Sequence, residues 1–184
     1  MGVGAVAHAA EKSAARRSAS AGLTKGDYVI IAAVSETVET HRFEVAATWS
    51  GDGAGMGRVS TSDGALGVPV AGAVVLGGSG GKANPEELFL AAIASCFVNT
   101  WAIFLKKLAL GYSEPSLKVE GQLEKDPAGG FRFQRAVIHA RVPAALLESR
   151  REQVEKTVSL AEKYCIISKA ARAAMPVEVR IEAA

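Results

Sequence analysis

The sequence has 184 residues, of which 49% are hydrophobic and 22% are charged, and its formal net charge is +2. This composition is sufficient to build a hydrophobic core and excludes a chain that is disordered throughout. Residues 1–26 contain four basic side chains and one acidic side chain, which leaves the remainder close to neutral. Because the part expected to fold has no basic excess, we expect no nucleic-acid partner.

We expect residues 1–40 to form an N-terminal extension, tail-like or partly ordered, ahead of one domain at 41–184. The first 26 residues are rich in Ala, Ser and Gly and contain no aromatic side chain. They lack the continuous apolar stretch of a secretory signal and resemble a transit peptide only faintly. The expected location is therefore the cytoplasm, where thiols stay reduced.

Short strands and glycine-rich turns are expected next. Alternating side chains predict a strand over 43–49, followed by a turn or flexible loop at 50–57. A returning strand is expected at 58–62 and a further edge segment within 62–70. The second glycine-rich loop, at 77–81, lacks the spacing of a phosphate-binding loop, so nucleotide binding is not indicated.

A long helix over 85–110 is the strongest local prediction. Asn84 is a good N-cap, Pro85 suits the first helical position, and Glu87 completes a capping box. Gly111 supplies the C-terminal stop.

This helix carries no charged residue from Leu88 to Leu105. Such a stretch is just long enough to span a membrane, but Ser95, Asn99 and Thr100 interrupt it, and we expect no membrane insertion. A helix that is apolar on all sides must be buried on all sides. One small chain would struggle to surround it, so we expect a homodimer that packs along this helix.

The remaining chain predicts a hairpin, a helix and a final strand. The hairpin comprises strands at 117–124 and 131–142, with a bulge near Gln134 where the alternation changes phase. An amphipathic helix follows, whose apolar face is formed by Leu147, Val154, Val158 and Ala161. Residues 177–181 form the last strand. The predicted class is α+β, with antiparallel sheets around long buried helices.

The two cysteines lie in different settings. Cys96 is inside the apolar helix, and Cys165 is at the end of the amphipathic helix. Two cysteines are too few for a disulfide scaffold or a structural zinc site. They are either small buried hydrophobes or a redox pair. His8, His41 and His139 show no ligand spacing, so we expect no metal and no cofactor.

Two segments carry a family resemblance. NPEELFLAAIASCF (84–97) resembles the NPEEL…A..ACF segment of the osmotically inducible protein C / organic hydroperoxide resistance (OsmC/Ohr) family, and YCIISKAA (164–171) resembles its CP.SKAL segment. The match extends in order and spacing over about residues 43–182. It implies an OsmC-like fold and an intertwined homodimer whose active sites lie at the subunit interface.

The resemblance also implies a thiol-dependent peroxidase that reduces organic hydroperoxides in oxidative-stress defence. Cys96 would be the peroxidatic cysteine, Cys165 the resolving cysteine and Glu86 the acidic partner. The apolar sequence around the cysteines favours an organic substrate, and a dithiol, of which lipoyl-type dithiols are an example, would be the reductant. The alternative is a non-catalytic OsmC-like stress protein or a cysteine redox sensor.

Two positions depart from the family pattern. Ile166 stands where the family usually has proline, and Gly55 stands at the position of the family's activating arginine. A buried thiolate needs a cation or hydrogen-bond donors, and we expect a cysteine in mid-helix to receive no help from a helix N-terminus. Arg58 is the nearest substitute, and Arg42 is the second choice.

Glu86 and Cys96 are ten positions apart in the predicted helix, which corresponds to ~15 Å along its axis. Glu86 therefore either favours the helix N-terminus only or acts across a dimer interface.

Overall fold

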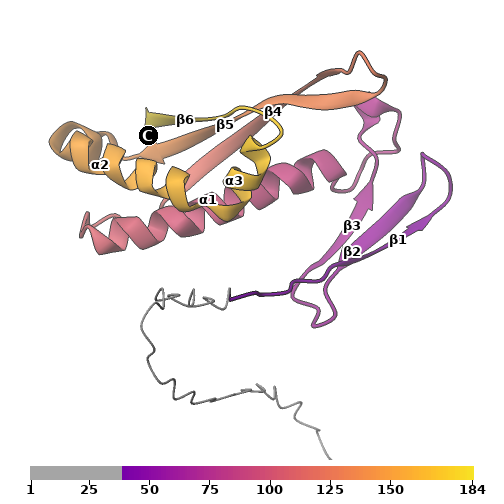
Figure 1. Cartoon of the computed structure of the whole chain (residues 1–184), viewed down its shortest axis with the longest axis horizontal. Helices are drawn as coiled ribbons and strands as arrows, with labels where there is room; N and C mark the ends of the chain where they lie inside the picture. Colours follow the sequence, from indigo (N-terminus) through magenta and orange to yellow (C-terminus); the bar gives the residue numbers. More distant parts are fainter. Residues whose placement is uncertain (1–38) are drawn as a thin grey trace, which may run out of the picture. The chain divides into compact units, whose positions relative to one another are not determined.

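The computed structural model describes residues 39–184 (Figure 1). Contacts divide the chain into two units, Met1–Arg42 and Phe43–Ala184. The expected extension at 1–40 lies outside the described residues, apart from its last two. The larger unit contains all the helices and strands described below.

Within residues 39–184, six strands form two three-stranded sheets, accompanied by three α-helices and one short 3₁₀ turn. The elements in chain order are β1 (Ala46–Ser50), β2 (Met56–Ser60), β3 (Gly67–Ala71), η1 (Val74–Leu76), α1 (Pro85–Lys107), β4 (Ser116–Lys125), β5 (Phe131–Val142), α2 (Ala144–Tyr164), α3 (Ile166–Arg172) and β6 (Val177–Ala183). The predicted α+β class is confirmed.

One strand pairing differs from the prediction of antiparallel sheets. The first sheet, in the order β1-β2-β3, is antiparallel, and so is the β4–β5 pair. However, β6 runs parallel to β5. The helices α2 and α3 lie between these two strands in the chain and carry it back, so that β6 starts at the same end as β5. The second sheet is therefore mixed.

The predicted bulge in the hairpin is confirmed. Gln122 pairs with Arg135 and Leu123 pairs with Phe133, so Gln134 is an extra residue in β5. This extra residue accounts for the change of phase in the alternation along the strand.

The strand expected over 43–49 begins only at Ala46, and all residues of β1 are exposed. Phe43, the first residue of the expected strand, is 92% exposed. The loop expected at 50–57 is the turn of the β1–β2 hairpin, and β2 starts at Met56. The alternating apolar residues of this region are therefore left exposed by the other described residues.

The start of α1 is the predicted capping box. The Glu87 N–H donates to Asn84 Oδ1 at 2.8 Å, and the Asn84 N–H donates to Glu87 Oε2 at 3.3 Å. The helix ends at Lys107, three residues before the predicted end. Ala109 already has a positive φ of 49°, so the chain leaves the helical conformation before it reaches Gly111.

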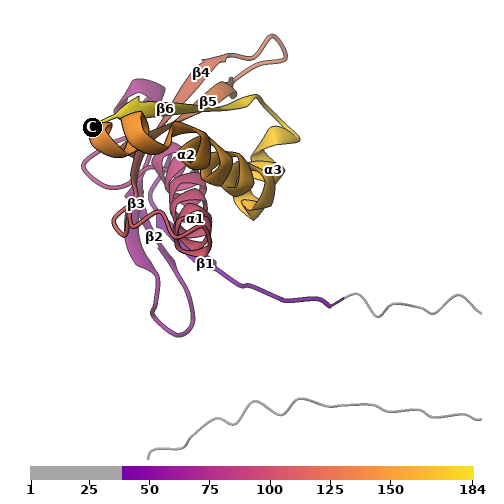
Figure 2. The ribbon, with the colours of Figure 1, turned by 90° about the vertical axis from the view of Figure 1, so that its left-hand side faces the viewer.

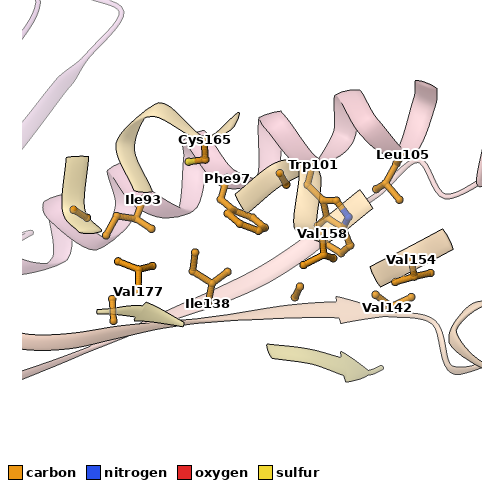
Figure 3. Close-up of a cluster of buried hydrophobic side chains, with 14 of the residues drawn as sticks. Ile93, Phe97, Trp101, Leu105, Ile138, Val142, Val154, Val158, Cys165 and Val177 are labelled. Carbon is orange, nitrogen blue, oxygen red and sulfur yellow. The ribbon is translucent and has the colours of Figure 1, made fainter. Parts of the chain in front are cut away.

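One face of α1 forms the centre of the hydrophobic core. Ile93, Phe97, Trp101 and Leu105 follow one another at intervals of four residues and are fully buried or nearly so (Figure 3). They pack against β5 and against the predicted apolar face of α2, which is buried as expected. Both α2 and α3 lie on the same side of the β4-β5-β6 sheet as α1 (Figure 1, Figure 2).

The other faces of α1 are less covered than the sequence led us to expect. Ile103, for example, is 45% exposed. By length and composition alone α1 could cross a membrane. Its central face nevertheless packs in the protein core, which identifies it as a core helix with an uncovered apolar side.

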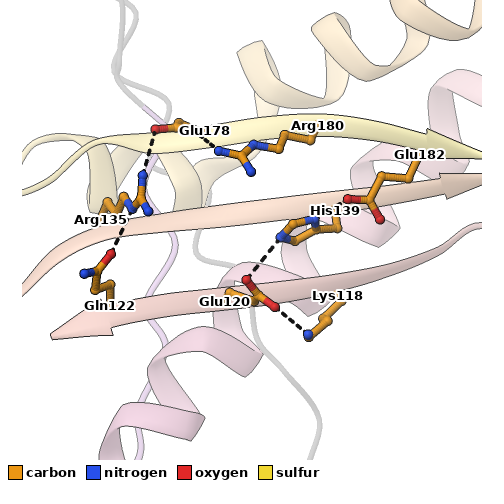
Figure 4. Close-up of polar contacts among 8 residues, drawn as sticks. All are labelled: Lys118, Glu120, Gln122, Arg135, His139, Glu178, Arg180 and Glu182. Carbon is orange, nitrogen blue, oxygen red and sulfur yellow. Dashed lines mark hydrogen bonds and ion pairs between the residues drawn. The ribbon is translucent and has the colours of Figure 1, made fainter.

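The opposite face of the β4-β5-β6 sheet is polar (Figure 4). His139 lies between two carboxylates there, with Nδ1 2.5 Å from Glu182 Oε1 and Nε2 3.4 Å from Glu120 Oε2. Hydrogen bonding from Lys118 holds the pKa of Glu120 below its ordinary value. Among the described residues, no group of three or more His, Cys, Asp or Glu side chains could hold a metal ion.

Candidate active site

The two cysteines come together where α1 packs against α3. Cys96 lies in the middle of α1 and is half-buried, whereas Cys165 lies between α2 and α3 and is fully buried. Cys165 belongs to the same buried cluster as Phe97 of α1 (Figure 3). Both are free thiols, and hydrogen bonding from the Cys165 side chain contributes to the lowered pKa of Cys96.

Cys165 is also the N-cap of α3. Its sulfur accepts a hydrogen bond from the Ser168 N–H at 3.4 Å and another from the Ser168 hydroxyl at 3.1 Å. Ser168 is fully buried, so water does not compete for these contacts. The cap turns the chain away from α2 and starts α3 beside α1.

The surroundings of Cys96 favour its thiolate. Burial on its own would raise its pKa, but hydrogen bonding from the Ile167 N–H, the Cys165 thiol, the Ile166 N–H and the Thr100 side chain outweighs burial. The pKa of Cys96 is therefore below its ordinary value of 9.0. The expectation that no helix start assists this cysteine was wrong, because the first amides of α3, and not those of α1, face the sulfur.

Cys165 shows the opposite behaviour. Burial raises its pKa above 9.0, and the neighbouring Cys96 raises it further, while the two hydrogen bonds from Ser168 only partly compensate. A thiolate at Cys96 that accepts a hydrogen bond from a neutral thiol at Cys165 is consistent with both shifts. The pair therefore combines one thiol whose pKa is lowered with one whose pKa is raised.

Glu86 lies in the first turn of α1 and lines a different site. It faces an apolar cavity of about 380 Å³ that is also lined by Leu90, Phe131 and Phe133, and neither cysteine lines this cavity. Glu86 Oε2 is buried without a hydrogen-bond partner among the described residues. Within one chain, the structure thus does not bring Glu86 to Cys96.

Arg58 points away from the helix that carries Cys96 within one chain. Its neighbour Val59 lines the groove between the β1-β2-β3 sheet and α1, so the alternation of the strand turns Arg58 to the opposite face. A side chain at Gly67 would collide with the Arg58 guanidinium, which shows that this group lies over β3. Arg42 belongs to the other unit and is not placed relative to the cysteines.

Sequence reasoning missed the donors that surround the two sulfurs. Ser168 follows Cys165 by three residues, which is the N-cap to N3 spacing of a capping motif, so a local signal for it existed. No local signal indicates that the amides of Ile166 and Ile167 face Cys96, because that contact joins segments far apart in the sequence.

Known proteins match this chain in both sequence and structure. The profile of the OsmC-like protein family matches residues 78–180. The "Organic hydroperoxide resistance protein-like 1" of Staphylococcus epidermidis is 35% identical over 127 residues, which cover 68% of this chain and 86% of that protein.

Solved structures match over most of their length. An organic hydroperoxide resistance protein OsmC from Legionella pneumophila superimposes with a TM-score of 0.64 at 27% identity, covering 78% of this chain and 99% of that one. A putative organic hydroperoxide resistance protein from Vibrio cholerae, with captopril bound in one of its active sites, gives a TM-score of 0.63 at 26% identity and covers 77% and 93% of the two chains. The chain belongs to the OsmC-like protein family, in the branch related to organic hydroperoxide resistance proteins.

Proposed function

We propose that this protein is a thiol-dependent peroxidase that reduces organic hydroperoxides, with Cys96 as the peroxidatic cysteine and Cys165 as the resolving cysteine. The observation that carries the proposal is the contact between two thiols whose pKa values are displaced in opposite directions. Relatives named for resistance to organic hydroperoxides support the substrate class.

In the first step, the Cys96 thiolate attacks the terminal oxygen of the hydroperoxide. The O–O bond breaks, an S–O bond forms, and the alkoxide takes a proton from solvent and leaves as an alcohol. Cys96 is then a sulfenic acid. The lowered pKa of Cys96 supplies the thiolate that this attack requires.

In the second step, the Cys165 sulfur attacks the Cys96 sulfur. The S–S bond forms as the S–O bond breaks, and the thiol proton leaves with the hydroxyl group as water. A dithiol, such as a lipoyl-type dithiol, then reduces the disulfide by thiol–disulfide exchange and becomes oxidised itself. Both cysteines return to thiols.

We further propose that two chains form a homodimer along α1. Between α1 and the β1-β2-β3 sheet, one chain leaves open an apolar groove of about 340 Å³ lined by Val59, Leu66, Val68, Leu88, Ala91, Ala92 and Ser95. Exposed apolar side chains such as Phe43 and Ile103 add to this uncovered surface. Surface of this kind is typical of an interface.

Glu86 and Arg58 enter the proposal as residues of different chains that the dimer would bring together. Glu86 has a buried carboxylate oxygen without a hydrogen-bond partner among the described residues, and the exposed Arg58 guanidinium lies over β3. A buried carboxylate requires a compensating charge or donor. We assign that role to a cation from the second chain, with Arg58 as the candidate, and we place the protein in the cytoplasm.

Two cysteine variants test the mechanism. Cys96→Ser abolishes hydroperoxide consumption in the presence of a dithiol, because the nucleophile is removed. Cys165→Ser consumes one equivalent and leaves a sulfenic acid at Cys96, which dimedone traps for mass spectrometry. Full turnover by Cys165→Ser would contradict the two-cysteine scheme. Oxidation without repeated turnover in the wild type would favour the redox sensor instead.

A further inference from the structure

The buried serine beside the resolving cysteine has no role in the scheme above. Ser168 lies at the third position of α3, and its side chain is fully buried. Its hydroxyl donates to Cys165 Sγ at 3.1 Å, and its backbone N–H donates to the same sulfur at 3.4 Å. Two donors thus converge on one buried sulfur atom.

We infer that the Ser168 hydroxyl is a catalytic group of the resolving step, in which it stabilises the negative charge that develops on Cys165 Sγ as its proton leaves for the attack on Cys96. This inference rests on the proposed function. The hydroxyl touches the reacting sulfur and is already oriented toward it before the reaction begins.

The physical need for such a donor follows from the position of Cys165. The thiol is fully buried, and burial is the main reason why its pKa lies above the ordinary value. A sulfur that must act as a nucleophile there can gain charge only if nearby donors stabilise that charge. Hydrogen bonds to charged acceptors are stronger than those to neutral ones, so the Ser168 bond strengthens as the proton leaves.

The atoms and electrons of the resolving step balance without a further reactant. Cys165 begins as a thiol and Cys96 as a sulfenic acid. The Cys165–Cys96 bond forms, the S–O bond of Cys96 breaks, and the Cys165 proton joins the departing hydroxyl to give water. Ser168 donates a hydrogen bond throughout and transfers no proton, and the external dithiol acts only after the disulfide exists.

Ser168 could matter only for the structure, because its backbone N–H forms the N-cap contact that starts α3. This capping role must be distinguished from the catalytic role of its hydroxyl. Ser168→Ala makes the separation, since it removes the hydroxyl and keeps the backbone N–H that forms the cap. A matched control is Thr157→Val, which removes another fully buried hydroxyl, one that accepts from Trp101 Nε1 at 3.0 Å. Thr157 is therefore a control for the general effect of losing a buried hydroxyl.

The test is a single turnover of the full chain with one equivalent of an alkyl hydroperoxide. Mass spectrometry follows the dimedone adduct of Cys96 and the Cys96–Cys165 disulfide over time. In Ser168→Ala we expect Cys96 to be oxidised at the wild-type rate and the disulfide to form about tenfold more slowly, as expected for the loss of one hydrogen bond to a charged acceptor. In Thr157→Val we expect both rates to equal those of the wild type.

Disulfide formation at the wild-type rate in Ser168→Ala would overturn this inference and leave the proposed function intact. Absence of the sulfenic acid and the disulfide in the wild type would overturn both. Should Ser168→Ala not fold, Ser168→Thr decides, because it keeps a hydroxyl at this position. A wild-type rate of disulfide formation in that variant supports the role, and a tenfold loss contradicts it.

Discussion

The replacement Ile166→Pro tests how this protein activates Cys96. The Ile166 N–H is one of the donors that lower the pKa of Cys96, and proline has no N–H to offer. Ile166 is the first residue of α3, where a helix tolerates proline best and where the N–H has no partner within the helix. The preceding residue, Cys165, has ψ 111°, close to the extended conformation that proline requires before it.

The magnitude follows from the loss of one donor to a charged acceptor. A bond of this kind contributes about 1.5 kcal/mol, which corresponds to about a tenfold lower thiolate fraction at a pH below the pKa. Ile167 keeps its N–H, so part of the activation persists. The side chain of Ile166 is 74% exposed, so its loss removes little buried surface. We expect the fold to be retained and the reactivity of Cys96 to fall.

The assay is the rate of Cys96 alkylation by iodoacetamide as a function of pH, measured in a Cys165→Ser background. The profile of Ile166→Pro moves to higher pH, and hydroperoxide consumption falls in parallel. Ile166→Ala is the matched control, because it removes the side chain but keeps the N–H, and its profile coincides with that of the parent. Identical profiles for the proline and alanine variants would refute the reasoning.

Four further outcomes are expected. At neutral pH, iodoacetamide labels Cys96 before Cys165, because burial raises the pKa of Cys165; equal labelling would contradict this assignment. Glu86→Gln lowers hydroperoxide turnover about tenfold, as expected if its carboxylate binds a cation of the partner chain, and a fully active variant would exclude it from the site. Phe97→Ala lowers the free energy of unfolding in urea by about 3–5 kcal/mol, since Phe97 is fully buried. The wild type sediments as a dimer and Ala91→Arg, in the open groove, as a monomer; a monomeric wild type would rule out the proposed interface.

The elements that the sequence predicted well are those with local causes. The capping box of α1 needs only Asn84, Glu87 and the residues between them. The bulge at Gln134 is visible as a change of phase within one strand. The parallel direction of β6 was missed because alternation along a strand indicates which face is buried and contains no information about the direction of its neighbour.

The candidate site was predicted less completely, because its chemistry depends on contacts between distant segments. The family resemblance identified Cys96 and Cys165, and the structure brings them together. The amides at the start of α3 were missed because a backbone N–H has no signature in the sequence. The resemblance implies proline at the position of Ile166, and the Ile166 N–H is a donor to Cys96 that proline would lack.

Three features that one chain leaves incomplete have a common explanation. The apolar side of α1 is partly uncovered, Phe43 is exposed, and Glu86 has a buried oxygen without a partner among the described residues. Any apolar partner could cover the exposed apolar surface. A buried carboxylate oxygen, in contrast, requires a hydrogen-bond donor or a cation at a defined position. In the proposed dimer, a second copy of the chain would supply both, since it would bring the same apolar surfaces together with Arg58. The dimer that covers α1 and the cation that completes Glu86 are therefore one hypothesis, and a variant that breaks the dimer should also lose activity.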